Sequence, residues 1–297
     1  MHRLKLTELY AVAGITRQSL YKYRQQEYGK AKQEELVVAA MKKMRKEHKK
    51  MSSRKVYSSQ KEVFKIKVGR DKFEQLAFGN GYRVKRSRQV CKTTWGQKAE
   101  VYPDLVTGIT INNINQVYQS DIFYLKVSDK DYYGITVIDV YSRRLVGLHI
   151  SKSLRAIENI IALKQVIKAK TTEKLKGYIF HSDRGSQYIS NAQKELLLNL
   201  EMQISMCKMP QQNAYAERVQ GSLKYEYYFE LLLTQKNITR VTARIKKLYN
   251  EQRPHQNLQG RTPMEYEAMI EKLNEGERPI LKIYEWDSAE KNLKECN

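Results

Sequence analysis

The strongest constraint on the fold of this chain is a change of hydrophobic pattern after its first third. Up to that point apolar residues recur at helical spacing, whereas three later runs, at 117–127, 132–140 and 145–151, are rich in β-branched and aromatic residues. Short polar connections at 128–131 and 142–144 are suited to hairpins. The sequence therefore predicts a helical region followed by three antiparallel strands.

Helices and strands alternate in the next part of the chain. The pattern predicts helices at 157–167, 191–200 and 213–233, with short strands at 178–180 and 204–206 between them. A strand that returns to the same sheet after a helical crossover runs parallel to the earlier strand, so the strand at 178–180 is expected to run parallel to the first one. The pattern alone thus predicts an α/β fold with a mixed sheet.

Three acidic residues that are distant in sequence become interesting once this sheet is predicted. Asp121 lies inside the first strand, although aspartate is depleted from strands. Asp183 follows the strand at 178–180, at the carboxyl end where open α/β sheets place their sites. Glu217 lies in the first turn of a helix for which Asn213 is a suitable N-cap.

Each of these acids also has an ordinary explanation, as a solvated strand residue, a turn residue or a partner of the helix dipole. Their co-occurrence favours a different one. Three converging carboxylates repel each other and are costly to desolvate unless cations lie between them. Oxygen-only ligands suit Mg²⁺ or Mn²⁺, and two such ions support in-line displacement at phosphorus.

Five short motifs around these residues occur in a fixed order and identify a family resemblance. They are Gln119-Ser120-Asp121, the segments 137–144 and 181–188, the segment 213–218 that contains Glu217, and the segment 249–255. In these motifs the chain resembles the integrase-core transposases of bacterial insertion sequences, within the superfamily of DDE transposases and retroviral integrases. The resemblance covers about the last two thirds of the chain.

The resemblance implies a ribonuclease-H-like fold with Asp121, Asp183 and Glu217 as the catalytic and metal-binding triad. It implies two Mg²⁺ ions, replaceable by Mn²⁺, with Asp121 and Asp183 sharing one and Glu217 helping to hold the other. Lys224, seven residues after the glutamate and on nearly the same helix face, is expected near the scissile DNA end. One departure is visible: 33 residues separate Asp183 from Glu217, a couple fewer than is usual in the family.

Other residues in the motifs are expected to be structural. Asp139 lies in the second strand and is expected to bond to a nearby turn. His255 is expected to be packed or to face DNA rather than to bind a metal.

Positive charge is concentrated near the start of the chain. The sequence holds 54 Lys and Arg against 32 Asp and Glu, a net charge of +22, and residues 1–100 hold 26 against 9, a net of +17. A surface of this kind favours a polyanion. The apolar runs are too short to span a bilayer, there is no signal-peptide pattern, and three widely spaced cysteines suggest no disulfide framework. A cytoplasmic, nucleoid-associated bacterial protein is expected.

Two pairs of helices in this basic region have helix-turn-helix spacing. The first pair, at 4–12 and 17–27, is joined by a turn in which Gly14 and a capping Thr16 stand. Its expected DNA contacts are Arg17, Gln18, Lys22 and Arg24, with Leu20 and Tyr21 packing inward. An ordinary helical hairpin with a solvated basic face remains an alternative for this pair.

A longer helix at 34–50 leads to the second pair, at 52–63 and 69–79, with residues 68–78 as the expected recognition helix. This pair resembles the helical module that precedes the integrase core in the family. The expected contacts are Lys67, Arg70 and Lys72, followed by Arg86 and Arg88 in a basic linker.

These elements predict a sequence of regions along the chain. They are a helix-turn-helix with a connecting helix (1–50), a second helix-turn-helix (51–90), a basic linker (91–112), the ribonuclease-H-like core (113–235), C-terminal helices (236–272) that include one at 240–250 and one starting at Pro263, and a tail (273–297).

The resulting functional hypothesis is a transposase that cleaves the ends of an insertion sequence and transfers the DNA strand to a target. Its expected partners are duplex DNA at the terminal repeats and the target, at least one further copy of itself, and an upstream helix-turn-helix protein or frameshift fusion. Three alternatives stay open: a catalytically inactive, transposase-derived DNA-binding regulator, a single-ion nuclease, and a non-specific chromatin-like protein.

Overall fold

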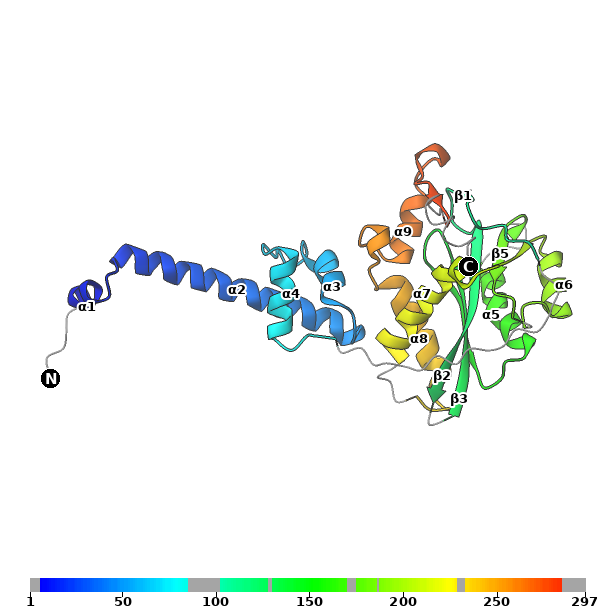
Figure 1. The fold of residues 1–297 in the computed structure, drawn as a ribbon, viewed down its shortest axis with the longest axis horizontal. Coiled ribbons are helices and arrows are strands. Elements are labelled where there is room, and N and C mark those ends of the chain that lie inside the picture. Colours follow the sequence, from blue (N-terminus) through cyan, green and yellow to red (C-terminus); the bar gives the residue numbers. More distant parts are fainter. Residues whose placement is uncertain are drawn as a thin grey trace, which may run out of the picture. The chain divides into compact units, whose positions relative to one another are not determined.

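The computed structural model describes residues 6–84, 102–127, 130–169, 175–185, 187–228 and 233–284. The chain divides into two compact units, Met1–Lys85 and Arg86–Asn297. The first is helical and the second contains the sheet (Figure 1). Within the described residues, no helix has the length and apolar character needed to cross a membrane.

The helical unit has a compact part built from three helices. α3 (Ser53–Gln60) and α4 (Arg70–Gly79) pack on the second half of α2 (Arg17–Glu47). Their shared core consists of Val37, Ala40, Met41, Met44, Met51, Val56, Ile66, Phe73 and Ala77. The helix pair predicted at 52–63 and 69–79 is therefore confirmed as two helices. Because α2 contributes to the same core, the region boundary expected at residue 50 lies inside this unit.

The first half of α2 differs from the prediction. The helices expected at 17–27 and 34–50 form one continuous helix of 31 residues. Gly29 is the only helix breaker between them, and a single glycine costs about 1 kcal/mol, too little to end a helix. α1 (Leu6–Val12) contains no buried residue. Tyr21 is 64% exposed, so its expected inward packing is wrong, whereas Leu20 is partly buried.

The turn between α1 and α2 forms as predicted. Gly14 adopts a left-handed φ of +63°, which glycine reaches without strain. The hydroxyl of Thr16 accepts a hydrogen bond from the backbone N–H of Ser19 at 3.0 Å and caps α2.

The second unit is organised around a five-stranded mixed sheet with the strand order β4-β3-β2-β5-β6. Its central strand, β2 (Val117–Val127), pairs antiparallel with β3 (Lys130–Asp139) and parallel with β5 (Ile179–Ser182). β4 (Leu145–Ser151) lies antiparallel to β3, and β6 (Gln203–Met206) lies parallel to β5. The predicted α/β class, mixed sheet and parallel return strand are confirmed.

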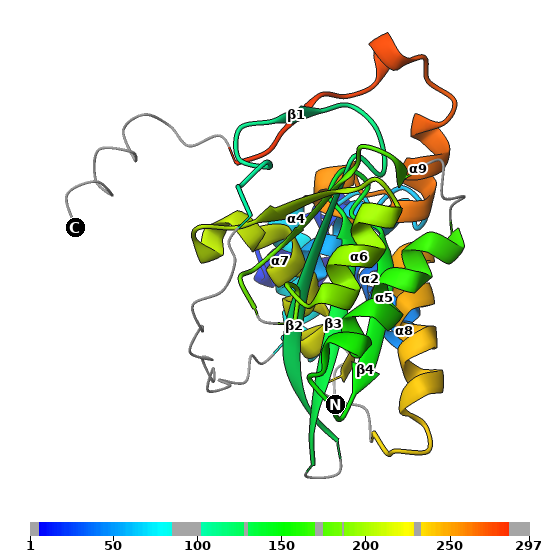
Figure 2. The ribbon, with the colours of Figure 1, turned by 90° about the vertical axis from the view of Figure 1, so that its right-hand side faces the viewer.

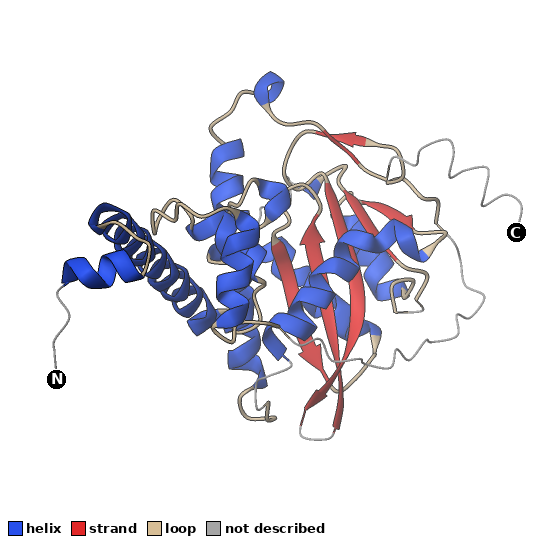
Figure 3. Cartoon of the chain, turned by 60° about the vertical axis from the view of Figure 1, so that its left-hand side comes forward, coloured by secondary structure: helices blue, strands red, loops and turns tan. Residues whose placement is uncertain are grey.

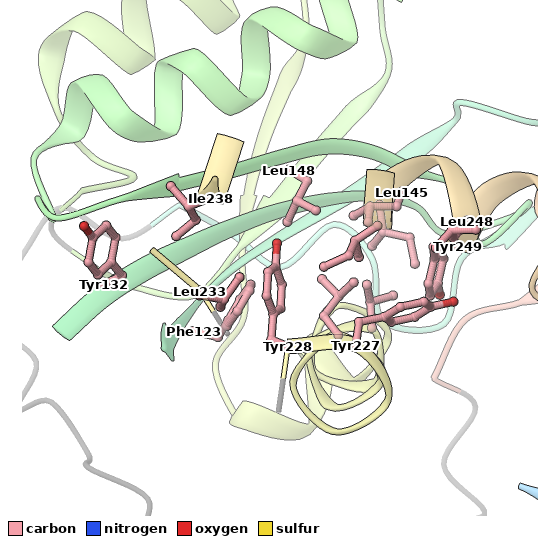
Figure 4. Close-up of a cluster of buried hydrophobic side chains, with 14 of the residues drawn as sticks. Phe123, Tyr132, Leu145, Leu148, Tyr227, Tyr228, Leu233, Ile238, Leu248 and Tyr249 are labelled. Carbon is pink, nitrogen blue, oxygen red and sulfur yellow. The ribbon is translucent and has the colours of Figure 1, made fainter. Parts of the chain in front are cut away.

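Helices cover both faces of this sheet (Figures 2 and 3). On one face α5 (Ala156–Ala169) and α6 (Asn191–Asn199) enclose a core with Tyr118, Ile135 and Val137. On the other face α7 (Ala214–Ser222) and α8 (Ile238–Glu251) enclose a second core, drawn in Figure 4. Because side chains alternate along a strand, the odd-numbered residues of β2 near its middle, such as Phe123, face α7 and α8.

The long helix predicted at 213–233 is helical through Tyr228 but is not a regular α-helix. α7 ends at Ser222 and continues as a π-helical turn over Leu223–Tyr227. In this turn the backbone N–H of Tyr228 donates to the carbonyl of Leu223, five residues earlier. The turn begins directly after the helix that carries Glu217, and it contains Lys224.

A smaller layer closes one end of the sheet. β1 (Thr110–Ile111) pairs with β7 (Leu281–Lys282), which brings the last described segment back to the beginning of the unit. α9 (Pro263–Ile270) begins with Pro263 after Thr262, whose hydroxyl accepts from the N–H of Glu265. The predicted helix start at Pro263 is confirmed.

Candidate active site

Asp121 and Asp183 leave the sheet from neighbouring strands at the same level. The last residues paired between the parallel strands β2 and β5 are Ser120 and Ser182. Asp121 is the next residue on β2 and Asp183 is the first residue after β5, and neighbouring strands lie about 4.8 Å apart. Both side chains are half-buried. The sheet register therefore brings the two predicted aspartates together.

The protonation of Asp121 reflects this arrangement. Burial, followed by the negative charge of Asp183, raises the pKa of Asp121 to about 7. The charge of Glu217 acts in the same direction, whereas the N–H of Ile122, which donates at 2.8 Å, and the charge of Lys224 oppose it. Asp121 is thus under the electrostatic influence of all three other predicted residues.

The other two carboxyl groups are shifted in the same direction. Burial raises the pKa of Asp183, although the N–H of Gly185 donates to its carboxylate at 3.0 Å. Burial also raises the pKa of Glu217, whose residue as a whole is exposed. The site therefore holds three carboxyl groups that all resist ionisation, which is a situation that a bound cation relieves.

Glu217 is held in place through the start of α7. Asn213 occupies the N-cap position, but its side chain makes no cap hydrogen bond. Its amide instead donates to the backbone carbonyl of Ser120 at 3.0 Å, so the capping role predicted for Asn213 is replaced by a tie to the residue before Asp121. Ala216 and Val219 are buried beneath α7, which leaves Glu217 on its outer surface.

The loop before α7, in which the short interval between Asp183 and Glu217 falls, is tied down by Gln212. The side-chain oxygen of Gln212 accepts from the N–H groups of Lys208 and Met209, at 2.6 and 2.9 Å. Its amide donates to Asp104 at 2.6 Å and to Thr107 at 2.9 Å. This network was not predicted from the sequence, since its partners are about one hundred residues apart.

The backbone carbonyl of Gln212 adds a link to the sheet. It accepts from the side chain of Gln119 at 3.2 Å and lies 3.1 Å from Nε2 of His181. Nδ1 of His181 lies 2.8 Å from the hydroxyl of Ser205. Since the carbonyl can only accept, Nε2 of His181 carries the proton, and Nδ1 accepts from Ser205. The shortened loop is therefore joined to β2, β5 and β6.

Lys224 lies above an aromatic ring next to Asp121. Its ammonium nitrogen is 5.6 Å from the centre of the Phe123 ring, a distance that allows a cation–π interaction. Phe123 lies two residues after Asp121 and so on the same face of β2. Gly134 faces this ring, and a Cβ atom at that position would lie 2.2 Å from it. A glycine inside a strand is typical of such a close approach, so Gly134 is a signal in the sequence that could have indicated it.

The donors at this site fit a hard divalent cation in their chemistry. Asp121 and Asp183 offer carboxylate oxygens from neighbouring segments, and burial raises the pKa of both. Across the described ranges, no three or more His, Cys, Asp or Glu side chains are arranged to hold a metal ion. The two aspartates are thus neighbours in the sheet, whereas Glu217 is exposed on α7.

The remaining predicted residues belong to the helical unit or to the linker that follows it. Six are exposed on the helical unit, namely Arg17, Gln18, Lys22 and Arg24 on α2 and Arg70 and Lys72 on α4, and Lys67 is exposed just before α4. Arg70 forms an ion pair with Asp71 at 2.9 Å. Arg86 and Arg88 lie outside the described residues. Exposure makes these side chains available for DNA without assigning them to it.

Asp139 and His255 occupy structural positions. Asp139 is fully buried and accepts from the N–H groups of Asn115 and Tyr141 at 2.7 and 2.8 Å, so the expected bond to a nearby turn is confirmed. Burial, followed by the charge of Glu267, raises the pKa of Asp139 to about 6. The ring of His255 packs edge-on against Tyr249 with their centres 5.0 Å apart.

The part of the chain that contains these acidic residues matches known protein families. The integrase core domain family matches residues 112–210, and a second integrase core domain family matches residues 199–263. These matches cover the strands that carry Asp121 and Asp183, helix α7 and α8. Together with the observed strand order, they confirm the ribonuclease-H-like core.

Curated relatives are transposases of insertion sequences. The chain is 29% identical over 160 residues to the transposase of IS904 from Lactococcus lactis, covering 52% of this chain and 61% of that protein. It is 29% identical over 165 residues to the putative transposase of IS986/IS6110 from Mycobacterium tuberculosis, covering 52% and 58%. Transposase InsF of IS3A from Escherichia coli is 30% identical over 157 residues, covering 52% and 54%. The match thus spans somewhat more than half the length of each relative.

Solved structures with a similar arrangement are retroviral integrases. The catalytic core domain of HTLV-2 integrase, in complex with magnesium, aligns with a TM-score of 0.42 and 18% identity over 52% of this chain and 97% of that chain. The two family matches together run from residue 112 to residue 263, so this part of the chain belongs to the integrase core domain family, and the curated proteins that it resembles are transposases of insertion sequences.

Proposed function

We propose that the protein catalyses cleavage of DNA at the ends of its insertion sequence and transfer of the freed 3′-hydroxyl strand to target DNA. The observation that carries this proposal is that Asp121 and Asp183 directly follow Ser120 and Ser182, the last residues paired between the parallel strands β2 and β5, and that the charges of Glu217 and Lys224 act on Asp121. A carboxylate cluster with a neighbouring lysine suits phosphoryl transfer, which needs no nucleophilic side chain. Water and the DNA 3′-hydroxyl are the successive nucleophiles.

Each acidic residue has a distinct role in this proposal. Asp121 and Asp183 jointly hold one Mg²⁺ ion, and Glu217 helps to hold a second, with Mn²⁺ as a substitute. When bound, the ions activate the nucleophile and stabilise the leaving oxygen. Since the pKa of Asp121 is about 7, this residue has to release its proton before it binds a cation at lower pH. Lys224 is directed at a phosphate of the DNA end.

DNA is held, in this proposal, by the helical unit as well as by the core. Residues 1–100 carry a net charge of +17, and the exposed Lys67, Arg70 and Lys72 lie at or just before the start of α4. Arg17, Gln18, Lys22 and Arg24 are proposed as further contacts. Two DNA ends must be brought together, so the active form contains at least two copies on DNA, and an upstream helix-turn-helix protein or frameshift fusion is a further proposed partner.

A second candidate function is a transposase-derived DNA-binding regulator without catalytic activity. The observation in its favour is that, among the described residues, no three acidic or other ligand side chains are arranged to hold a metal as they stand. The interval of 33 residues between Asp183 and Glu217 points the same way. The two candidates differ only in whether the carboxylates do chemistry.

The change Asp183→Asn separates them, because it removes a negative charge and keeps the shape of the side chain. We expect DNA binding to stay within a few-fold of wild type, and cleavage and strand transfer to fall by at least about 10³-fold, since a metal ligand is lost. Asp131→Asn, the same change at an exposed strand position, is the matched control. Equal strand transfer by wild type and Asp183→Asn would refute the catalytic role.

A further inference from the structure

Arg253, in the motif at 249–255, is a buried arginine whose guanidinium group contacts four other side chains. Its residue is 3% exposed. Nε and Nη2 donate to the two oxygens of Glu226, each at 2.8 Å, which is a bidentate ion pair. Nη2 also donates to the hydroxyl of Ser222 at 3.0 Å. The guanidinium lies over the Tyr249 ring, 5.2 Å from its centre, and Nη1 is 3.2 Å from Nε2 of His255.

The two side chains that Arg253 binds are at the ends of the π-helical turn. Ser222 is the last residue of α7, and Glu226 lies within Leu223–Tyr227. Lys224 is between them in sequence. The turn also packs on the hydrophobic core, because Tyr227 and Tyr249 belong to one buried cluster and lie next to each other in Figure 4. Arg253 therefore joins both ends of the turn to the segment that follows α8.

The direction of Lys224 depends on this turn. A π-helical turn is wider than an α-helical one, so it rotates the residues within it relative to the preceding helix. Glu217 lies on the regular part, whereas Lys224 lies in the π-helical part. In the observed geometry, the ammonium group of Lys224 lies above Phe123, beside Asp121. An ordinary α-helix through the same residues would direct Lys224 differently.

We propose that Arg253 is a positioning residue for the DNA end: its ion pair with Glu226 and its bond to Ser222 hold the π-helical turn, and the turn holds Lys224 over Phe123. This inference rests on the proposed function, in which Lys224 contacts a phosphate of the DNA end. Replacing a buried ion pair with apolar residues is often neutral for stability, so a contribution to folding alone does not explain a bidentate pair here. A need to hold the π-helical turn in one geometry does explain this bidentate pair.

The experiment measures the salt dependence of binding to a short duplex taken from the end of the element. Each lost phosphate contact lowers the slope of log K against log salt concentration by about 0.9. Lys224→Met is expected to lower the slope by that amount. Arg253→Lys, which cannot form the bidentate pair, is expected to lower it equally, and the double variant no further, because both changes remove the same contact.

Two further variants separate positioning from folding. The matched control is Arg144→Lys, because Arg144 forms another largely buried ion pair, with Glu267 at 2.7 Å, that joins the turn after β3 to α9. It is expected to reduce the melting temperature without changing the slope. The apolar exchange Arg253→Met with Glu226→Leu is expected to fold and still to show the low slope. If Arg253→Lys misfolds, this exchange carries the test.

Different results overturn different statements. An unchanged slope in Arg253→Lys or in the apolar exchange, with a lowered slope in Lys224→Met, would overturn the inference alone. A second loss of about 0.9 in the double variant would also overturn it, since the two residues would then act independently. An unchanged slope in Lys224→Met would remove the phosphate contact itself and with it this part of the proposed function.

Discussion

The two units of the molecule carry their charged residues in opposite ways. Met1–Lys85 holds 22 Lys and Arg against 8 Asp and Glu, and the basic residues proposed to bind DNA in it are exposed. Arg86–Asn297 holds 32 against 24, and its functional candidates Asp121 and Asp183 are half-buried with raised pKa values. The first unit is thus suited to reversible binding of a polyanion, and the second to holding cations at fixed positions.

The comparison teaches how differently the two kinds of site tolerate change. Exposed charges contribute in proportion to their number, so removal of one weakens DNA binding only in part. Half-buried acids on paired strands depend on a register that a single substitution disrupts. On this division, one substitution can weaken DNA binding without affecting catalysis, and another can abolish catalysis without affecting DNA binding.

The largest expected effect comes from emptying the core of the helical unit. Phe73 is 0% exposed and packs edge-on against Tyr57 with ring centres 5.4 Å apart, so Phe73→Ala is expected to cost about 3–5 kcal/mol. Amides of α3 and α4 should lose protection from hydrogen exchange, and DNA affinity should fall, while Mg²⁺ binding to the core measured by calorimetry stays unchanged. Phe78→Ala is the control, because Phe78 is 37% exposed on the same helix. Loss of Mg²⁺ binding in Phe73→Ala would show that the units are not separable.

The elements that the sequence predicted best are those with strong local signals. The predicted strands at 117–127 and 145–151 have the observed bounds of β2 and β4. Runs of β-branched and aromatic residues bounded by polar turns specify a strand within a few residues. The helical crossover predicted that the strands before Asp183 and around Asp121 run parallel, whereas their adjacency followed from the resemblance to a ribonuclease-H-like fold.

The features that escaped prediction depend on partners far away in sequence. Gln212 binds Asp104, and Arg253 binds Glu226, and no local pattern links these residues. The continuity of α2 was also missed, because the polar residues between the two predicted helices show no apolar stripe of their own. Asparagine is a favoured N-cap residue, but the side chain of Asn213 donates its hydrogen bond to the carbonyl of Ser120 on β2 instead. Tertiary contacts decided each of these cases.

The second prediction concerns acid stability, which the core should lose through His181. Burial lowers the pKa of this histidine to about 4 from 6.5, so its neutral form is favoured in the folded state. The resulting stability is fully present above pH 6.5 and is lost as the pH falls through about 4, by about 3 kcal/mol in total. The unfolding free energy measured in urea between pH 7 and 4 tests this.

The variant His181→Gln isolates that contribution. The raised pKa values of Asp121 and Asp139 act in the opposite direction, since those groups favour folding at low pH, but they do so equally in both proteins. The difference between wild type and His181→Gln should therefore shrink as the pH falls. A difference that stays constant from pH 7 to 4 would mean that His181 titrates normally in the folded state.

A smaller effect is expected from the exposed basic residues of the helical unit. The triple change Lys67→Ala, Arg70→Ala and Lys72→Ala should weaken binding to duplex DNA about 10- to 100-fold and lower the salt slope by up to about 2.7. The rate of strand transfer at saturating DNA should stay unchanged, because the carboxylates are untouched. The control removes three exposed lysines of the core unit, Lys164, Lys168 and Lys236. An equal loss in the control would show that net charge, rather than this surface, binds DNA.

The smallest expected effect is the release of a fraction of a proton when Mg²⁺ binds, and it tests the role of Asp121 directly. With a pKa of about 7, Asp121 is about half protonated at pH 7, and a metal ion needs the carboxylate. Mg²⁺ binding at pH 7 should therefore release about half a proton from Asp121, measured by calorimetry in two buffers of different ionisation enthalpy. Affinity should rise about fivefold between pH 6 and 7 and about twofold more by pH 8. In Asp121→Asn this release should disappear. Mg²⁺ binding without proton release in the wild type would mean that the ion does not bind Asp121, and the contrast between a binding unit and a metal-dependent unit would then fail at its central residue.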